Sequence, residues 1–315
     1  MTNQAEIRNS KVLSRAVSEC LKKPLGQILI EAGLISINQL EIALREQQES
    51  GLSIGEMMAI YGWIDRRTTD FFADRWKEII QKEEKKPLVY YFQESGLLTE
   101  KQVKYLLEKQ RRRNSKSRFH HLVVEEGLLK QVTVDYFLTH LFGLYSPNPV
   151  PLEKPFEIIK DYVRGQTNFK NSDLEKVPLM NVSLKGIKLD ESNLRKANFH
   201  ESDLSYSSFV AANLSRADLS KTTLREANLG NAVLKKANLR DSNLEKSNFR
   251  AADLQEADLR DAYLKEASFE DANLQGAKLM LEYAYDVYYN ERTTFDPRFS
   301  PELAGWRKLN IADEI

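Results

Sequence analysis

REANLGNAVLKKANLRDSNL, residues 225–244, decides the fold, because Leu recurs in it at every fifth position with a small residue two places before. The leucines are Leu229, Leu234, Leu239 and Leu244, preceded by Ala227, Ala232, Ala237 and Ser242. On an α-helix, a spacing of five precesses by roughly 140° each time, so the leucines would spiral around the helix. In a flat strand, residues five apart point to opposite faces. The spacing therefore excludes both structures.

The same register continues far beyond this stretch. From Phe169 to Leu279, all 23 positions spaced by five are Leu or Phe. A backbone that turns by about a right angle every five residues directs all of them to one axis, so that four units complete a square coil. Coils paired at about 4.8 Å then predict just under six coils and a rod roughly 27 Å long. Asn or Asp just before the Leu suits the corners, as at Asn228, Asn238, Asn243, Asp253 and Asp258.

The triplets ANL, ADL and SNF, repeated in this register, are similar to those of the pentapeptide-repeat family, and the resemblance covers residues 167–280. It implies a right-handed quadrilateral β-helix in which the central Leu or Phe fills the core. Residues 156–166 resemble the helix that often caps the first coil in this family, and residues 281–315 resemble a C-terminal capping tail. The expected fold class is α+β multidomain, with an all-α half followed by this pentapeptide-repeat β-solenoid.

A second and weaker repeat occupies the first half of the chain. Residues 24–47 predict a helix, a turn at Gly33, a helix cap at Ser36 and a second helix with Leu40 and Leu44 on one face. This helix-turn-helix pattern recurs at residues 53–76, 87–110 and 118–141, which makes two pairs of repeats. We therefore expect an N-terminal helix at 1–22, a helical domain at 23–145 and a proline-rich linker at 146–155.

The helical repeats, at residues 23–141, resemble the MshEN-type N-terminal domain of type II secretion and pilus-assembly ATPases, whose tandem motifs bind cyclic di-GMP. The resemblance implies nucleotide contacts from Leu25, Gly26, Gly33, Gln47 and Arg118. The arginine that opens the family motif occurs only in the fourth copy, as Arg118. The ATPase motor is absent, because the sequence holds no P-loop motif. Cyclic di-GMP binding and a role in packing and partner binding are the two alternatives for this module.

Composition indicates neither nucleic acid nor an anionic membrane as partner, because 46 Lys and Arg balance 46 Asp and Glu. Cys20 is the lone cysteine, and the polar start of the chain lacks the apolar core of a signal peptide. No apolar run approaches the ~18 residues that span a bilayer. A cytoplasmic protein without membrane insertion is therefore expected.

Neither a catalytic site nor a metal site is expected. The histidines have no cysteine partners and no metal-binding spacing; they are His120, His121, His140 and His200. No nucleophile stands with a plausible base, which favours a protein that is not an enzyme. The basic run at residues 109–118 would suit an anion, although the dipole of a preceding helix also favours cations there. Cyclic di-GMP is thus the only cofactor that the sequence suggests.

The charge of the repeat segment separates the functions that remain. Between Thr167 and Met280 there are 17 Lys and Arg and 17 Asp and Glu. Pentapeptide-repeat proteins that mimic DNA and bind gyrase need a strongly negative rod, so gyrase modulation is disfavoured and no DNA partner is expected. A neutral rod of mixed charge suits a protein partner. Its contacts would come from outward residues such as Arg225, Lys235, Lys236, Arg240 and Asp241.

We therefore expect a non-enzymatic, regulatory adaptor that acts through protein–protein interaction. The resemblances link it to pilus, secretion or differentiation machinery of a bacterium, and pentapeptide coils are common in cyanobacteria. The first alternative is a cyclic di-GMP receptor that senses through its helical half. A homodimer formed through the last coil is a further arrangement that the family resemblance allows, unless the aromatic tail folds over that end.

Overall fold

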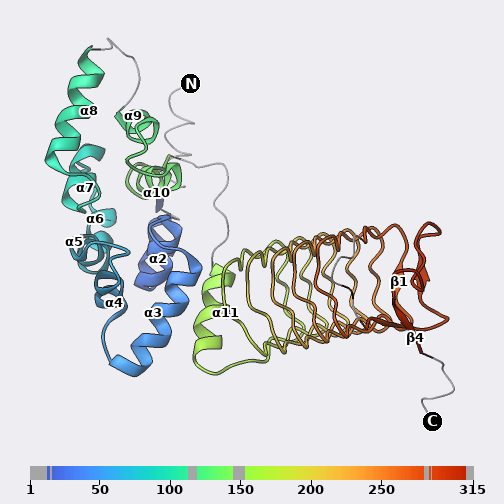
Figure 1. The fold of residues 1–315 in the computed structure, drawn as a ribbon. Coiled ribbons are helices and arrows are strands. Elements are labelled where there is room, and N and C mark those ends of the chain that lie inside the picture. The colour runs from blue at the N-terminus through green and yellow to red at the C-terminus, as the bar shows by residue number, and fades with distance from the viewer. Residues whose placement is uncertain are drawn as a thin grey trace. The chain divides into compact units, whose positions relative to one another are not determined.

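The computed structural model describes residues 13–14, 16–112, 119–144, 153–279, 284 and 286–309. The chain separates into two compact units, Met1–Leu152 and Glu153–Ile315, which are treated one at a time (Figure 1). Within the described ranges, no helix combines the length and the apolar character that crossing a membrane requires. Most of the predicted linker, and part of the N-terminal helix predicted at 1–22, lie outside the described residues; residues 16–22 are helical.

The first unit is helical, as predicted. Each predicted repeat contains a short first helix of seven residues and a longer second segment. The pairs are α2 (Leu25–Glu31) with α3 (Ile37–Ser50), α4 (Ile54–Ile60) with α5 (Arg66–Asp70), the π-helical turn η1 (Phe71–Arg75) and α6 (Trp76–Gln81), α7 (Leu88–Glu94) with α8 (Glu100–Arg112), and α9 (Phe119–Glu125) with α10 (Gln131–Phe142).

Local sequence explains where these helices begin and turn. The Ser36 hydroxyl accepts a bond from the Gln39 N–H at 3.2 Å, and the Gln39 side chain accepts one from the Ser36 N–H at 2.8 Å. This reciprocal cap, predicted at Ser36, satisfies two backbone groups that a helix N-terminus leaves open. Each turn between paired helices contains a glycine with φ between 66° and 77°; these are Gly33, Gly62, Gly96 and Gly127.

An aromatic cluster forms the core of the helical unit. Trp76, Phe72 and Phe137 are completely buried, and the Trp76 and Phe137 rings lie 4.9 Å apart. The second repeat has Trp76 where the first has Gln47, and the burial explains the difference: Trp76 fills the core, whereas Gln47 remains partly exposed. At this position of the repeat, the second copy thus has a side chain that packs in the core and the first copy has a polar one.

The second unit is a stack of coils in which parallel bridges join residues 20 apart, from Asn168 with Lys188 to Ser268 with Tyr288. Four pentapeptides therefore form one coil. The Leu229 N–H donates to the Asn248 carbonyl of the next coil at 2.7 Å. The central side chains are completely buried through most of the stack, as the spacing of five predicts. The right-handed sense of the coil stays a prediction.

Small residues beside the central Leu or Phe keep the interior narrow, and serine is accommodated there by a local bond. The Ser242 hydroxyl donates to the Leu239 carbonyl at 2.6 Å, and the Ser247 hydroxyl donates to the Leu244 carbonyl at 2.6 Å. Because a buried hydroxyl is costly unless it is bonded, this contact lets Ser replace Ala inside the coil.

The predicted corner position needs a correction. The Asn or Asp just before the Leu forms the bridge between coils, and the turn follows the Leu. The second residue after the Leu is the left-handed one, with φ between 55° and 62° at the non-glycine positions of the repeats. Asn228 supports the turn from beside it, because its Oδ1 accepts a bond from the Gly230 N–H at 3.0 Å. The local bonding expected of Asn is present, but the Asn stands three residues before the left-handed position.

Helix α11 (Glu153–Val163) lies over the first coil and begins three residues before the predicted start at 156. Pro155 is its third residue, and a proline is tolerated in a first helical turn because the N–H there has no partner within the helix. Ile159 of this helix is completely buried, and the Tyr162 hydroxyl donates to the Lys185 carbonyl at 2.8 Å. The first coil is therefore covered.

The tail covers the other end of the coil. Strand β1 (Asn273–Leu274) pairs in parallel with β3 (Thr294–Phe295), and β2 (Tyr288–Tyr289) pairs in parallel with β4 (Arg307–Lys308). The Trp306 ring stacks on Phe269 of the last coils with centroids 5.3 Å apart and is 5% exposed. The tail thus continues the core instead of leaving an open stack edge.

Candidate functional site

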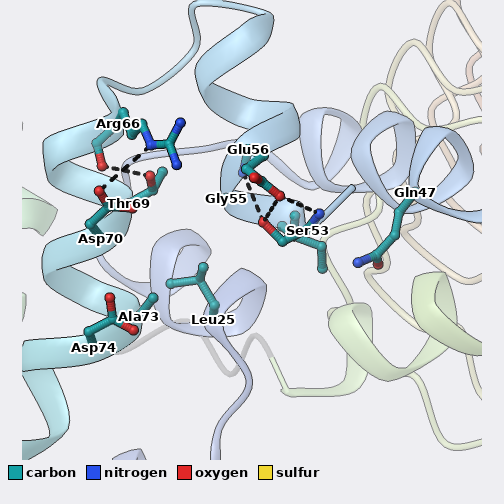
Figure 2. A pocket seen from close by; sticks show the side chains of 11 residues that line it. Leu25, Gln47, Ser53, Gly55, Glu56, Arg66, Thr69, Asp70, Ala73 and Asp74 are labelled. Carbon is teal, nitrogen blue, oxygen red and sulfur yellow. Dashed lines mark hydrogen bonds and ion pairs between the residues drawn. The ribbon is translucent and has the colours of Figure 1, made fainter. Parts of the chain in front are cut away.

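A pocket of about 480 Å³ lies among α2, α3, α4, α5 and η1 of the helical unit (Figure 2). Two of the predicted nucleotide contacts, Leu25 and Gln47, line it from the first repeat. The other lining residues come from the second repeat and are Ser53, Ile54, Gly55, Glu56, Arg66, Thr69, Asp70, Ala73 and Asp74. The two repeats of the first pair therefore build one hollow.

One side of the pocket is the N-terminus of α4, where polar groups bond each other. The Ser53 N–H donates to the Glu56 carboxylate at 2.9 Å, and the Ser53 hydroxyl donates to it at 2.8 Å. Both bonds lower the pKa of Glu56 below its ordinary value, and the bond from the Ser53 N–H has the larger effect. A negative charge is therefore fixed at this edge, and the Glu56 side chain already has partners within the chain.

The opposite side carries further carboxylates. Arg66 and Asp70 form an exposed ion pair with Nε and Oδ2 3.9 Å apart, and the Thr69 hydroxyl donates to the Arg66 carbonyl at 2.8 Å. Asp74 adds another carboxylate on the same face. The lining thus has three carboxylates and one guanidinium. Such a pocket favours a cationic or neutral group over the phosphates of a nucleotide.

The predicted cyclic di-GMP contacts are only partly brought together. Leu25 and Gln47 line the pocket, whereas Gly26 is buried in α2. Gly33 lies at the turn after α2, where a side chain would collide with Val132 of α10. Arg118 lies outside the described residues. The resemblance to the MshEN type and the nucleotide contacts stay predictions.

The contact with Val132 gives Gly33 a structural role that can be measured. We expect Gly33→Ala to destabilise the helical unit by about 2 kcal/mol or more, because a left-handed residue with a Cβ costs about 1–2 kcal/mol and the methyl group must also displace Val132. Gly62→Ala is the matched control, since Gly62 has φ 66° and nothing within 4 Å of an added Cβ. Urea unfolding followed by far-ultraviolet circular dichroism measures both variants. Equal losses in the two would contradict a packing role for Gly33.

Sequence reasoning missed Arg66, Asp70 and Asp74. They come from the second repeat, on the segment that faces the first repeat, whereas the motif resemblance points only to positions within each copy. Their spacing of four residues, from Arg66 to Asp70 and on to Asp74, would place them on one face of a helix. This spacing could have pointed to a site, but charged residues four apart are also common on exposed helical faces without one.

The outward surface of the coils is dominated by ion pairs between residues of neighbouring coils. Four of the five predicted outward residues take part, since Arg225 lies 3.3 Å from Glu245, Lys235 lies 3.1 Å from Asp253, Lys236 lies 3.2 Å from Glu256 and Arg240 lies 3.4 Å from Asp261. Within residues 167–279, no column of stacked outward positions is acidic throughout; Lys221 interrupts the column that contains Glu201, Asp241 and Asp261. The structure thus gives no support to the hypothesis that the rod mimics DNA and binds gyrase.

The histidines lie in three places: His120 and His121 adjoin each other on α9 with ring centroids 4.4 Å apart, and the other two lie apart from them. His140 is buried beside Tyr136, and the His200 Nδ1 lies 2.8 Å from the Ser220 hydroxyl on the coil. In the parts of the chain that the structure describes, no three His, Cys, Asp or Glu side chains gather as metal ligands would.

Comparison with known proteins identifies the repeat segment. The family model named Pentapeptide repeats matches residues 178–215, 212–250 and 242–280. An uncharacterized protein of Picosynechococcus sp. is 38% identical over 120 residues, which are 38% of this chain. The chain spans 64% of the length of that relative.

Several solved pentapeptide-repeat structures are similar to part of the chain. A protein of the Arabidopsis thaliana thylakoid lumen is 24% identical, with 33% of this chain and 72% of that chain covered and a TM-score of 0.32. HetL, involved in heterocyst differentiation regulation in the cyanobacterium Nostoc sp., is 24% identical, with 45% and 90% covered and a TM-score of 0.27. The match to the family model shows that residues 178–280 of this chain are pentapeptide repeats.

Proposed function

We propose that this protein is a non-enzymatic adaptor whose pentapeptide-repeat rod binds a protein partner. The observation that carries the proposal is the division of the coil into a filled interior and a charged exterior. The central Leu and Phe side chains are completely buried through most of the stack, so they hold the shape and are closed to a ligand. The exposed side chains, fixed in rows on a rigid backbone, are the groups that remain for recognition.

Rigidity supports this proposal. Pentapeptides within the stack are bonded to the coils on either side, as where the Asn228 N–H donates to the Ser207 carbonyl at 2.9 Å and the Leu229 N–H donates to the Asn248 carbonyl at 2.7 Å. A surface held in this way loses little conformational freedom when it binds a partner, which favours affinity. The link to pilus, secretion or differentiation machinery and the cytoplasmic location stay predictions.

The adaptor proposal is tested by affinity capture with the full-length folded chain from a cyanobacterial lysate. We expect a specific protein to be retained, and to be lost when the outward residues Arg225, Lys235, Lys236, Arg240 and Asp241 are changed together to Ala. The control changes as many exposed residues of the helical unit that lie outside the candidate pocket, namely Glu78, Lys82, Glu100, Lys101 and Lys104. Recovery of no protein above an empty support would contradict the proposal.

The cyclic di-GMP receptor is the second candidate, and it is favoured by one observation: Leu25 and Gln47 lie in the same pocket. The three carboxylates of that pocket oppose it, because they would face the phosphates of the nucleotide. Calorimetry of the full-length chain with cyclic di-GMP decides between the two. A heat of binding that Gln47→Ala removes, and that Gln48→Ala leaves unchanged, would favour the receptor.

A further inference from the structure

One column of the rod departs from the charge pattern of the others. The coil register places residues 20 apart on neighbouring coils, and in this column every such residue over four coils is a cation. We call the column the basic ladder; its residues are Lys176, Lys196, Arg216 and Lys236. All four are exposed and occupy the left-handed turn position, with φ between 59° and 61°. At about 4.8 Å per coil, the ladder is about 14 Å long.

Elsewhere on the rod, neighbouring coils pair opposite charges. Lys170 lies 2.9 Å from Glu191, and Lys221 lies 3.2 Å from Glu201. In the basic ladder only the two end residues form ion pairs among the described residues: Lys236 lies 3.2 Å from Glu256 on the next coil, and Lys176 lies 3.5 Å from Glu175, its neighbour in the sequence. Among the described residues, neither Lys196 nor Arg216 has an ion-pair partner, although each has cations on the coils above and below.

The fold does not require cations in this column. The same turn position in another column holds Asn171, Ala211 and Asn231, so the left-handed conformation accepts uncharged residues. Asn also adopts this conformation more readily than Lys or Arg. Four like charges on adjacent coils repel one another, which weakens the stack instead of supporting it. A local choice that opposes stability without serving the fold indicates a binding function.

The surroundings of the ladder limit the shape of its partner. Arg195 and Lys235 stand one residue before the ladder, but each lies 3.1 Å from a carboxylate, Glu175 and Asp253, so the positive strip is the ladder itself. Carboxylates flank the strip, with Glu175 beside its first coil and Asp218 on the neighbouring wall. The strip is therefore straight, short and narrow. A nucleic acid would extend beyond it onto these carboxylates, and the ladder positions have no aromatic residues on which bases could stack.

We propose that the basic ladder binds an acidic α-helix of a partner protein, with one Asp or Glu from each helical turn opposite one cation of the ladder. An α-helix advances about 5.4 Å per turn and the rod about 4.8 Å per coil, so long side chains can follow both repeats over this length. The inference deepens the proposed adaptor function and rests on it. It names the surface and the chemistry of the partner.

Removal of the two unpaired cations tests the ladder. The variant K196Q/R216Q is compared with K221Q/K246Q, which removes as many charges from the same turn position in other columns. Both are made in the full-length chain, and circular dichroism verifies folding. The probe is a synthetic helical peptide with one Glu per turn along a single stripe. A second peptide has the same composition with its Glu residues spread around the helix, and a DNA duplex is the third probe.

We expect the striped peptide to bind the wild-type chain in fluorescence anisotropy at low ionic strength. Its affinity should fall about tenfold in K196Q/R216Q and change less than about twofold in K221Q/K246Q, because only the first variant removes contacts. The spread peptide should bind more weakly than the striped one. Equal binding of the two peptides, equal losses in the two variants, or no peptide binding would each overturn the inference. Tighter binding of the duplex, lost in K196Q/R216Q, would assign the ladder to nucleic acid instead.

The outcome also separates this inference from the adaptor function. If a captured partner still binds K196Q/R216Q as well as it binds the wild-type chain, the ladder proposal fails while the adaptor function stands. If the folded wild-type chain retains no partner, the adaptor function fails, and the result with the striped peptide then shows only whether the ladder can hold an acidic helix.

Discussion

Phe249→Ala is expected to destabilise the coil by about 3–5 kcal/mol, the usual cost of removing a fully buried phenyl ring. Phe249 is completely buried, and its ring stacks on Phe269 with centroids 4.8 Å apart and an angle of 2° between the planes. Phe269 in turn stacks on Trp306 of the tail. The loss should therefore spread along this wall toward the end of the rod, because each coil is supported mainly by its neighbours.

Phe249→Leu is the matched control, since Leu229 occupies the same wall one coil earlier. Leu leaves a smaller cavity than Ala, so the cost should be lower, about 1–2 kcal/mol. Hydrogen–deuterium exchange of the full-length chain measures both variants residue by residue and separates the coils from the helical unit. If Phe249→Ala left the exchange of the last coils and of the tail unchanged, the wall of stacked rings would not be a cooperative support.

Acid is expected to destabilise the helical unit through His140. Burial is the main cause that lowers the pKa of His140 to about 4, with a smaller opposing effect from its bond to the Tyr136 carbonyl. The folded state holds the His140 imidazole neutral. The contribution of His140 to the free energy of unfolding is therefore complete above the unfolded pKa of about 6.5, and it is lost as the pH falls toward the folded pKa of about 4. About 3 kcal/mol should be lost over this range, at about 1.4 kcal/mol per pKa unit.

His140→Phe isolates this effect, because the phenyl ring fills a similar volume between Trp76 and Tyr136 but cannot take a proton. Urea unfolding of the full-length chain, followed by the circular dichroism of its helices, is measured from pH 7 to 4. The exposed carboxylates titrate in both proteins, so the difference between the two profiles belongs to His140. Parallel profiles would show that the imidazole is not held neutral in the folded state.

The candidate pocket shows which of its residues the sequence resemblance could predict and which it could not. The motif positions Leu25 and Gln47 do meet in one pocket, because they belong to a single helix-turn-helix repeat whose geometry is local. The same reasoning failed to find Arg66, Asp70 and Asp74, since they depend on how the second repeat packs against the first. Gly33 stays a predicted ligand position, and the structure adds a requirement of packing between distant repeats, because a Cβ on Gly33 would collide with Val132 of α10.

The sequence by itself determined the coil. A large apolar residue at every fifth position has to be buried, and only a chain that turns once per pentapeptide buries all of them. The tertiary structure decided what the outside of the coil does. Outward side chains such as Lys196 and Arg216 carry no burial constraint, so the fivefold period does not mark them as a group. The bonds between coils confirm that residues 20 apart are neighbours, and the side-chain contacts distinguish the basic ladder from the columns in which opposite charges pair.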